Sequence, residues 1–186
     1  MASILTVIDA HEGPTEIDTT VGGVLFCDVD GTVADFTHRR LASEAVPKAY
    51  KWPVFRKNMD QDLPIQPIID AVKTLKAAGW VVVMMTARSR IDLEVTEEWL
   101  AKYGITYDAI YIRDDWVRNE DGSIKLTRKG KQMPDSRKDD IVKTELLAKA
   151  RADGYDPTLV FDDRNQVVDM WRSHGIMCVQ VAEGDF

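Results

Sequence analysis

Long apolar runs are missing from this 186-residue sequence, although 45% of its residues are hydrophobic. No stretch approaches the roughly 20 consecutive apolar residues that a membrane-spanning helix needs. The opening residues, MASILTVIDAHEG, also lack the basic start and the apolar core of a secretion signal. We therefore expect no contact with a membrane, and a cytoplasmic location.

Cysteine is also scarce, and acidic residues outnumber basic ones. The two cysteines, Cys27 and Cys178, stand within apolar runs, which favours buried thiols over a disulfide or a metal site. The net charge of -7 excludes a general attraction to nucleic acid but leaves room for a local basic face. The length favours one domain with a substantial core.

Five short apolar runs predict the strands of a sheet. Each is too short for a helix and rich in Val, Ile, Phe or Tyr, and most lack polar alternation, which is typical of parallel strands covered on both faces. The runs are Val24–Val29, Trp80–Met85, Ala109–Ile112, Thr158–Phe161 and Ile176–Val181.

Helical patterns separate these runs. Apolar residues recur at helical spacing from Ile65 to Leu75, and further helices are expected over about Ile91–Lys102, Lys138–Arg151 and Asn165–His174. Alternating strands and helices predict an α/β fold with a doubly wound parallel sheet.

Three segments fall outside this alternation. Residues 1–22 are expected to be an extension with an extra strand or hairpin at most, and residues 37–63 show little periodicity. Residues 114–137 form a polar insert with a turn signal in NEDGS. The insert carries four basic residues, Lys125, Arg128, Lys129 and Lys131. Such an insert is either a solvated loop or a contact surface for substrate phosphates.

Acidic residues stand where two predicted strands end. Asp28 and Asp30 follow the first strand in CDVDGT, and Asp162 and Asp163 follow the fourth in VFDDRN. Ligands of open parallel sheets bind at this edge, where Thr86 also ends a strand. Two carboxylates about 4 Å apart repel by about 4 kcal/mol at an effective dielectric constant near 20, and bound Mg²⁺ relieves that repulsion. The ordinary alternative is that each acidic pair caps a turn or helix.

These motifs resemble those of the haloacid dehalogenase (HAD) superfamily. DVDGT, from Asp28 to Thr32, is similar to the nucleophile motif of these phosphotransferases; Thr86 is similar to the second motif, a helical lysine to the third and Asp162-Asp163 to the acidic fourth. The segments RKDDIVKTELL and FDDRNQVVDMWRSHGIMCVQVAEGDF further resemble the 3'-phosphatase domain of phage polynucleotide kinase/phosphatase enzymes. The likeness covers residues 23–186 apart from the insert. It implies a HAD-like Rossmannoid fold, and a host cytoplasm if a phage encodes the chain.

The resemblance also implies roles for single residues. Asp28 would be the nucleophile that forms an aspartyl-phosphate, and Asp30 would protonate the leaving oxygen and later deprotonate water. Thr86 would donate a hydrogen bond to the phosphoryl group, and Lys143, preferred over Lys138, would stabilise its charge.

The remaining roles concern the metal and the substrate. The resemblance implies a Mg²⁺ site formed by Asp28, Asp162 and Asp163, with Asp30 contributing its main-chain carbonyl. Arg39, for which Arg40 is an alternative, and Arg88 would bind the substrate phosphate. Asp139 lies four residues before Lys143 on one helix face, which fits either a substrate-binding pair or an ordinary surface ion pair.

Departures from the family pattern limit the substrate prediction. The sequence has no GxxxxGK[ST] loop, so the kinase half of these enzymes is missing from it. The segment from Asp35 to Leu63 is too short for a large cap domain, which predicts an open site.

Several functions compete. The preferred one is removal of a 3'-phosphate from a nucleic-acid end, and the alternative is hydrolysis of nucleoside monophosphates or other small phosphoesters. A phospho-acceptor signalling module would place its paired acids at the first strand, and an inactive binding protein would not need the complete motif set.

Overall fold

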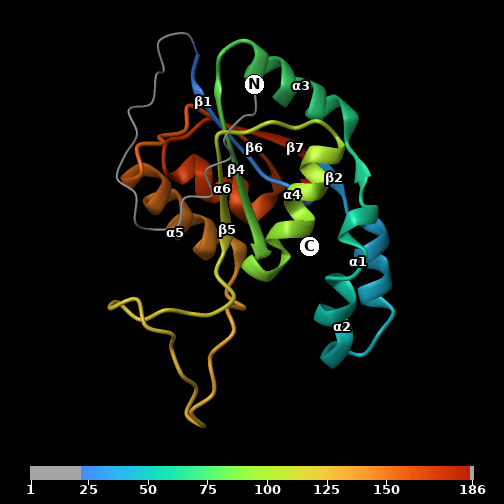
Figure 1. The fold of residues 1–186 in the computed structure, drawn as a ribbon, viewed down its shortest axis with the longest axis vertical. Helices are drawn as coiled ribbons and strands as arrows, with labels where there is room; N and C mark the ends of the chain where they lie inside the picture. The colour runs from blue at the N-terminus through green and yellow to red at the C-terminus, as the bar shows by residue number, and fades with distance from the viewer. Residues whose placement is uncertain (1–21, 185–186) are drawn as a thin grey trace.

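The computed structural model describes residues 22–184, so residues 1–21 of the expected extension lie outside the described part. Five parallel strands form the main sheet in the order β5-β4-β1-β6-β7 (Figure 1). Their bounds are β1 Val24–Cys27, β4 Val81–Ser89, β5 Ala109–Arg113, β6 Leu159–Arg164 and β7 Cys178–Gly184. The predicted doubly wound parallel sheet is confirmed.

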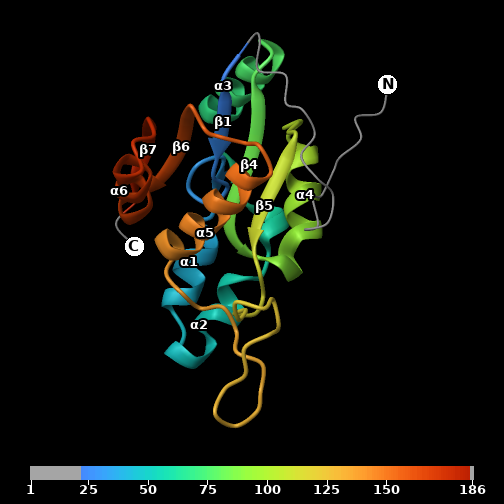
Figure 2. The same ribbon diagram turned by 90° about the vertical axis from the view of Figure 1, so that its left-hand side faces the viewer.

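Helices cover both faces of this sheet. The large helices are α3 Gln66–Ala77, α4 Leu93–Lys102, α5 Asp139–Ala152 and α6 Asn165–Ser173. Figure 2 shows α4 and α5 on opposite sides of the strands. A short 3₁₀ turn, Arg90–Asp92, precedes α4, which therefore begins two residues later than predicted.

The core explains why the strand sequences do not alternate. On β1, Phe26 packs with Leu147 and Trp171 from α5 and α6, while Leu25 packs with Ile69 and other residues on the α3 and α4 side. Successive side chains of a strand point to opposite faces, and both faces here are buried. Burial of each such side chain contributes about 1.5–3 kcal/mol.

Two short helices fill the segment for which no regular structure was predicted. They are α1 Thr37–Glu44 and α2 Lys48–Phe55, followed by a 3₁₀ turn, Met59–Gln61. The antiparallel pair β2 Ala34–Asp35 and β3 Leu63–Pro64 closes the segment at its base. We call residues 37–62 the small cap; its two short helices agree with the expectation that the segment from Asp35 to Leu63 is too short for a large cap domain.

The polar insert, residues 114–137, extends from the end of β5. Isolated bridges join Trp116 to Pro134, Arg118 to Ile124 and Leu126 to Gln132. The turn predicted in NEDGS is confirmed, because the Asn119 amide donates to the Ser123 carbonyl at 2.9 Å and Gly122 has a φ of 81°. Figure 1 shows the insert and the small cap on opposite sides of the carboxyl edge of the sheet.

Two further expectations concern cysteine and membranes. Cys27 and Cys178 are free and buried, as predicted. Among residues 22–184, no helix has both the length and the apolar character required to cross a membrane.

Candidate active site

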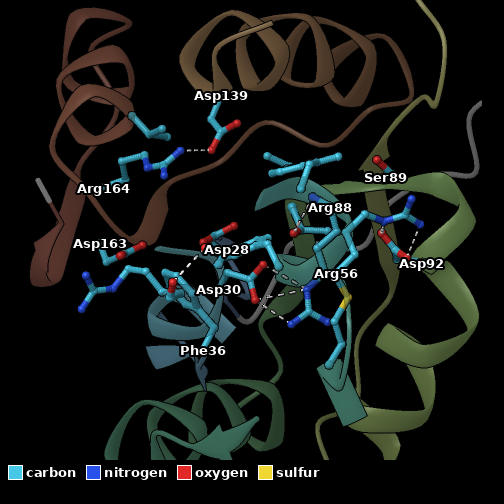
Figure 3. A pocket seen from close by; sticks show the side chains of 18 of the residues that line it. Asp28, Asp30, Phe36, Arg56, Arg88, Ser89, Asp92, Asp139, Asp163 and Arg164 are labelled. Carbon is cyan, nitrogen blue, oxygen red and sulfur yellow. Dashed lines mark hydrogen bonds and ion pairs between the residues drawn. The ribbon is translucent and has the colours of Figure 1, made fainter. Parts of the chain in front are cut away.

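The carboxyl ends of three neighbouring strands meet at one cavity of about 370 Å³. Cys27 of β1 is in register with Met84 of β4 and Phe161 of β6, so the acidic residues that follow β1 and end β6 become neighbours. Asp28, Thr86 and Asp162 all line this cavity. Figure 3 shows Asp28 there, near Asp30 and Asp163.

Lys143 is the central cation of the cavity. It comes from α5, is 2% exposed, and places Nζ 2.8 Å from Oδ1 of Asp28 and 2.7 Å from Oδ2 of Asp162. Burial alone would lower the pKa of this lysine, but the two carboxylates outweigh burial and raise it. Lys143 therefore stays charged at neutral pH. The alternative, Lys138, is the residue preceding α5.

Asp28 and Asp163 are held in an acidic, dehydrated environment. Burial raises the pKa of Asp28 well above its ordinary value; Lys143 acts against this shift, whereas Asp162 and Asp163 add to it. Burial, reinforced by Asp162, raises the pKa of Asp163 to about 6. A cation placed among these carboxylates would offset both shifts.

Three carboxylates fit a metal ion. Asp28, Asp162 and Asp163 each offer an oxygen, and these atoms lie within 4.8 Å of one another. Gly31 makes room for this approach, because a Cβ at that position would lie 2.1 Å from Oδ2 of Asp163, and its φ of 85° also suits glycine. The donor set is hard oxygen, as Mg²⁺ prefers. The carboxylate of Asp30 is not part of this group of three.

The Asp30 carboxylate instead contacts two buried arginines. Arg88 donates to it from Nη2 at 2.6 Å and from Nε at 3.2 Å, and Arg39 donates from Nη2 at 2.7 Å. Burial would raise the pKa of Asp30, but the guanidinium groups of Arg88 and Arg39 outweigh it and lower this pKa. Asp30 is therefore ionised in the free protein at neutral pH.

Asp62, which the sequence analysis missed, organises these arginines. It is fully buried and accepts bonds from Nε of Arg39 at 2.6 Å and from Nη2 of Arg88 at 2.9 Å. His38 lies 2.9 Å from the same carboxylate. The two arginines thus stand between two aspartates, in a buried network whose charges balance. No motif marks Asp62, because its partners are distant in the sequence.

The predicted substrate-binding residues differ in their access to the cavity. Arg88 lines it, whereas Arg39 is 1% exposed and lies behind the ring of Phe55; its alternative, Arg40, is part of the lining. Thr86 lines the cavity and accepts a hydrogen bond from the Arg88 amide at 3.2 Å, which leaves its hydroxyl proton for another acceptor.

Asp139 also lines the cavity but has other partners than expected. Its carboxylate pairs with Arg113 of β5 and with Arg164 at the end of β6. Arg113 also donates to the main-chain carbonyl of Arg137 at 2.7 Å. Asp139 therefore joins the base of the insert to the cavity wall, while the rest of the insert does not contribute to that wall.

The small cap supplies an entire wall that the sequence did not predict. It contributes five residues to the lining that are aromatic or basic, namely Arg40, Lys51, Trp52, Phe55 and Arg56, and Phe36 directly precedes it. Arg56 holds the cap to the body of the protein, with Nε 2.9 Å from Oδ2 of Asp92 (Figure 3). Their contribution depends on how α2 packs over the sheet edge, which the sequence alone does not reveal.

Comparisons with known proteins agree with this geometry. Residues 23–186 match the family model described as the polynucleotide kinase PNKP phosphatase domain. A chain of the Pnkp1/Rnl/Hen1 RNA repair complex is 32% identical, with a TM-score of 0.66; the match covers 96% of this chain and 48% of that one. A second structure of the Pnkp1/Rnl/Hen1 complex gives 31% identity, a TM-score of 0.67, and coverage of 97% and 53%.

A more distant structure shares the fold alone. It is the D,D-heptose 1.7-bisphosphate phosphatase from B. bronchiseptica, with 18% identity, a TM-score of 0.51, and coverage of 84% of this chain and 78% of that one. The chain spans about half the length of the RNA repair proteins it matches. The matched residues and the geometry of the cavity establish that this chain belongs to the HAD-like family of polynucleotide kinase PNKP phosphatase domains.

Proposed function

We propose that this protein is a Mg²⁺-dependent phosphomonoesterase that removes the 3'-phosphate from nucleic-acid ends. The observation that carries the proposal is the ion pair between Lys143 and Asp28 at the bottom of an open, partly basic cavity. A buried lysine at 2.8 Å keeps the carboxylate of Asp28 oriented and supplies positive charge where a phosphoryl group would sit.

Asp28 is the proposed nucleophile. One of its oxygens bonds to phosphorus while the bond from phosphorus to the 3'-oxygen breaks, and Asp30 donates a proton to that oxygen. Water then attacks the aspartyl-phosphate, Asp30 takes the proton, and inorganic phosphate leaves as the Asp28 carboxylate is restored. Thr86 and Arg88 donate hydrogen bonds to the phosphoryl oxygens.

The acid role requires a proton on Asp30, although Arg88 and Arg39 lower its pKa in the free protein. A phosphate dianion beside Asp30 would oppose this effect, because a second negative charge favours the protonated carboxyl group. The dianion would also compete with Asp30 for Arg88. Substrate binding itself therefore favours the form of Asp30 that donates a proton.

Magnesium fits the three carboxylates of Asp28, Asp162 and Asp163, and the main-chain carbonyl of Asp30 is a further candidate ligand. When bound, the ion supplies positive charge that neutralises the phosphate oxygens. Trp171 holds Asp162 in place by donating to its Oδ2 at 3.1 Å.

The substrate class is supported by the similarity to RNA repair proteins and by the basic and aromatic wall of the small cap. Phosphorylated ends would reach Asp28 because, among residues 22–184, no large cap covers the sheet edge. A cavity of about 370 Å³ also suits a single nucleotide, and this favours hydrolysis of nucleoside monophosphates as a second candidate function.

A phosphate-release assay tests the proposal. It compares a 3'-phosphorylated oligonucleotide, its 5'-phosphorylated isomer and free nucleoside monophosphates, each with Mg²⁺ and with chelator. We expect the highest kcat/KM for the 3'-phosphorylated end, and no phosphate release from any substrate with chelator. Preference for the free nucleotides would support the second candidate, and equal release in chelator would contradict the metal assignment.

A further inference from the structure

The small cap presents a stacked pair of aromatic rings to the cavity. The rings of Trp52 and Phe55 are 5.5 Å apart between centroids and inclined by only 11°. Both residues line the same cavity as Asp28, and Trp52 is 55% exposed. One face of the indole thus rests on Phe55, and the side chain retains a large accessible surface next to the reaction site.

The Phe55 ring of this pair is held rigidly. The guanidinium group of Arg39 lies 4.8 Å from the centroid of the Phe55 ring, and its Nη1 donates to the Phe55 carbonyl at 3.0 Å. Phe36 packs its edge against the same ring at 5.7 Å. Because Arg39 is itself fixed by Asp62, Trp52 rests on a preorganised support.

We propose that Trp52 is a stacking platform for the base of the 3'-terminal nucleotide. This proposal rests on the proposed function, and it names how the substrate is recognised. A planar aromatic face at the wall of a phosphatase cavity fits the π-face of a nucleobase, and such stacking is tolerant of base identity. Lys51 lines the same wall and offers positive charge to the neighbouring phosphates, whereas Arg40 on that wall pairs with Glu44 at 3.0 Å.

The occupant is inferred from the surroundings of the platform. Trp52 shares its cavity with the basic residues Lys51 and Arg56 and with the carboxylates of the reaction site, as well as with Phe55. A nucleotide fits this combination because it offers a base to an aromatic ring and phosphate to a cation. The carboxylates and Lys143 fix where the terminal phosphate binds. The nucleoside attached to it then extends along the wall on which Trp52 lies.

The test compares two oligonucleotides that differ only in the terminal base. Both carry a 3'-phosphate, but in one the terminal nucleotide is abasic, so the number of phosphates is equal. We expect the unmodified protein to favour the intact end by about tenfold in kcat/KM, mainly through KM, as stacking of one base allows. Trp52→Ala should remove this preference by raising KM for the intact end, while the abasic end is hydrolysed as before.

Two further variants separate stacking from general effects. Trp52→Phe should retain most of the preference, because phenylalanine offers a smaller π-face. Tyr50→Ala is the matched control, because Tyr50 is 63% exposed on the same helix but does not line the cavity. This variant should leave kcat/KM unchanged for both substrates.

Equal losses on both substrates in Trp52→Ala, or no preference in the unmodified protein, would overturn the platform. Release of phosphate from the abasic end establishes the 3'-phosphatase activity whatever Trp52 does. A failed platform thus leaves activity without preference, whereas a failed function leaves no release from either end and overturns both proposals.

Discussion

Replacement of Lys143 by methionine tests the electrostatics at the centre of the site. The change keeps an unbranched side chain of similar length in a position that is only 2% exposed. It removes the cation between Asp28 and Asp162, whose oxygens lie within 4.8 Å of each other and of Asp163. Three carboxylates then share a buried site without a positive partner.

The cost follows from these distances. Two ionised carboxylates 4.8 Å apart repel by about 3 kcal/mol at an effective dielectric constant near 20. Removal of one partner from a buried ion pair typically costs about 3–5 kcal/mol. We therefore expect Lys143→Met to lose about 3–5 kcal/mol of unfolding free energy at pH 7.5 in chelator.

The loss must depend on pH with a definite sign. The pKa of Asp28 is already raised in the folded protein, and loss of Lys143 raises it further. A carboxyl group with a raised folded pKa costs nothing while both states are protonated, and it destabilises the fold progressively as pH rises from the unfolded pKa to the folded pKa. The difference between variant and unmodified protein should therefore shrink from pH 7.5 to pH 5, and Mg²⁺ at pH 7.5 should reduce it.

Urea unfolding at both pH values, with and without Mg²⁺, measures the effect. Lys149→Met, on the same helix, is the control for loss of a lysine and should show little dependence on pH. The double variant Lys143→Met/Asp162→Asn should regain part of the stability, since one repelling charge is gone. A loss of equal size at pH 5 and pH 7.5, unaffected by Mg²⁺, would refute the electrostatic account.

Four other predictions concern catalysis and substrate. Asp28→Asn should fold normally but lose about 10⁴-fold or more in kcat, measured by phosphate release; activity near that of the unmodified protein would rule out the aspartyl-phosphate. Asp162→Ala should weaken both Mg²⁺ dependence and turnover in a metal titration, whereas full activity in EDTA would contradict the metal site. Asp62→Asn should lower kcat and cost about 3 kcal/mol in urea unfolding, because Arg39 and Arg88 lose a shared buried carboxylate; unchanged values would remove its organising role. Replacement of all four basic residues of the insert by serine should raise KM for a 3'-phosphorylated oligonucleotide in a salt-dependent manner, but not for a small aryl phosphate. The four residues are Lys125, Arg128, Lys129 and Lys131. Equal effects on both substrates would indicate that the insert is a solvated loop.

Most of the sheet could be predicted because strands that are buried on both faces have uninterrupted apolar sequences. The run from Val24 to Cys27 is apolar at every position, and Gly79 and Gly175 mark helix ends with positive φ. Helix α2 has no comparable sequence pattern. Its sequence, KAYKWPVF, contains Pro53 and has no fully buried residue, so neither periodicity nor propensity indicates a helix there.

Part of the candidate site could likewise be predicted from the sequence, and part could not. Asp28 follows β1, and Thr86 and Asp162 lie in the carboxyl-terminal halves of β4 and β6. Parallel topology brings these ends together, so the proximity of the three residues follows from the sequence pattern, although β4 runs on to Ser89. The partners of Asp30 do not follow from it. Asp62 meets Arg88 only because the small cap folds back over the sheet edge, and a contact of this kind depends on tertiary packing between segments with no shared motif.

Arg39 shows how the small cap and the reaction site act as one unit. The sequence suggested a phosphate ligand, but the structure places this guanidinium group between the Phe55 ring and the carboxylates of Asp30 and Asp62. It thereby supports the proposed platform from below and lowers the pKa of Asp30 from the side. A base that stacks on Trp52 would therefore contact an aromatic pair supported by Arg39, the same residue that binds the carboxylate of Asp30, the proposed acid. Under the two proposals, recognition of the terminal nucleotide and proton transfer to its 3'-oxygen share the buried side chain of Arg39, and Arg88 acts with it to lower the pKa of Asp30.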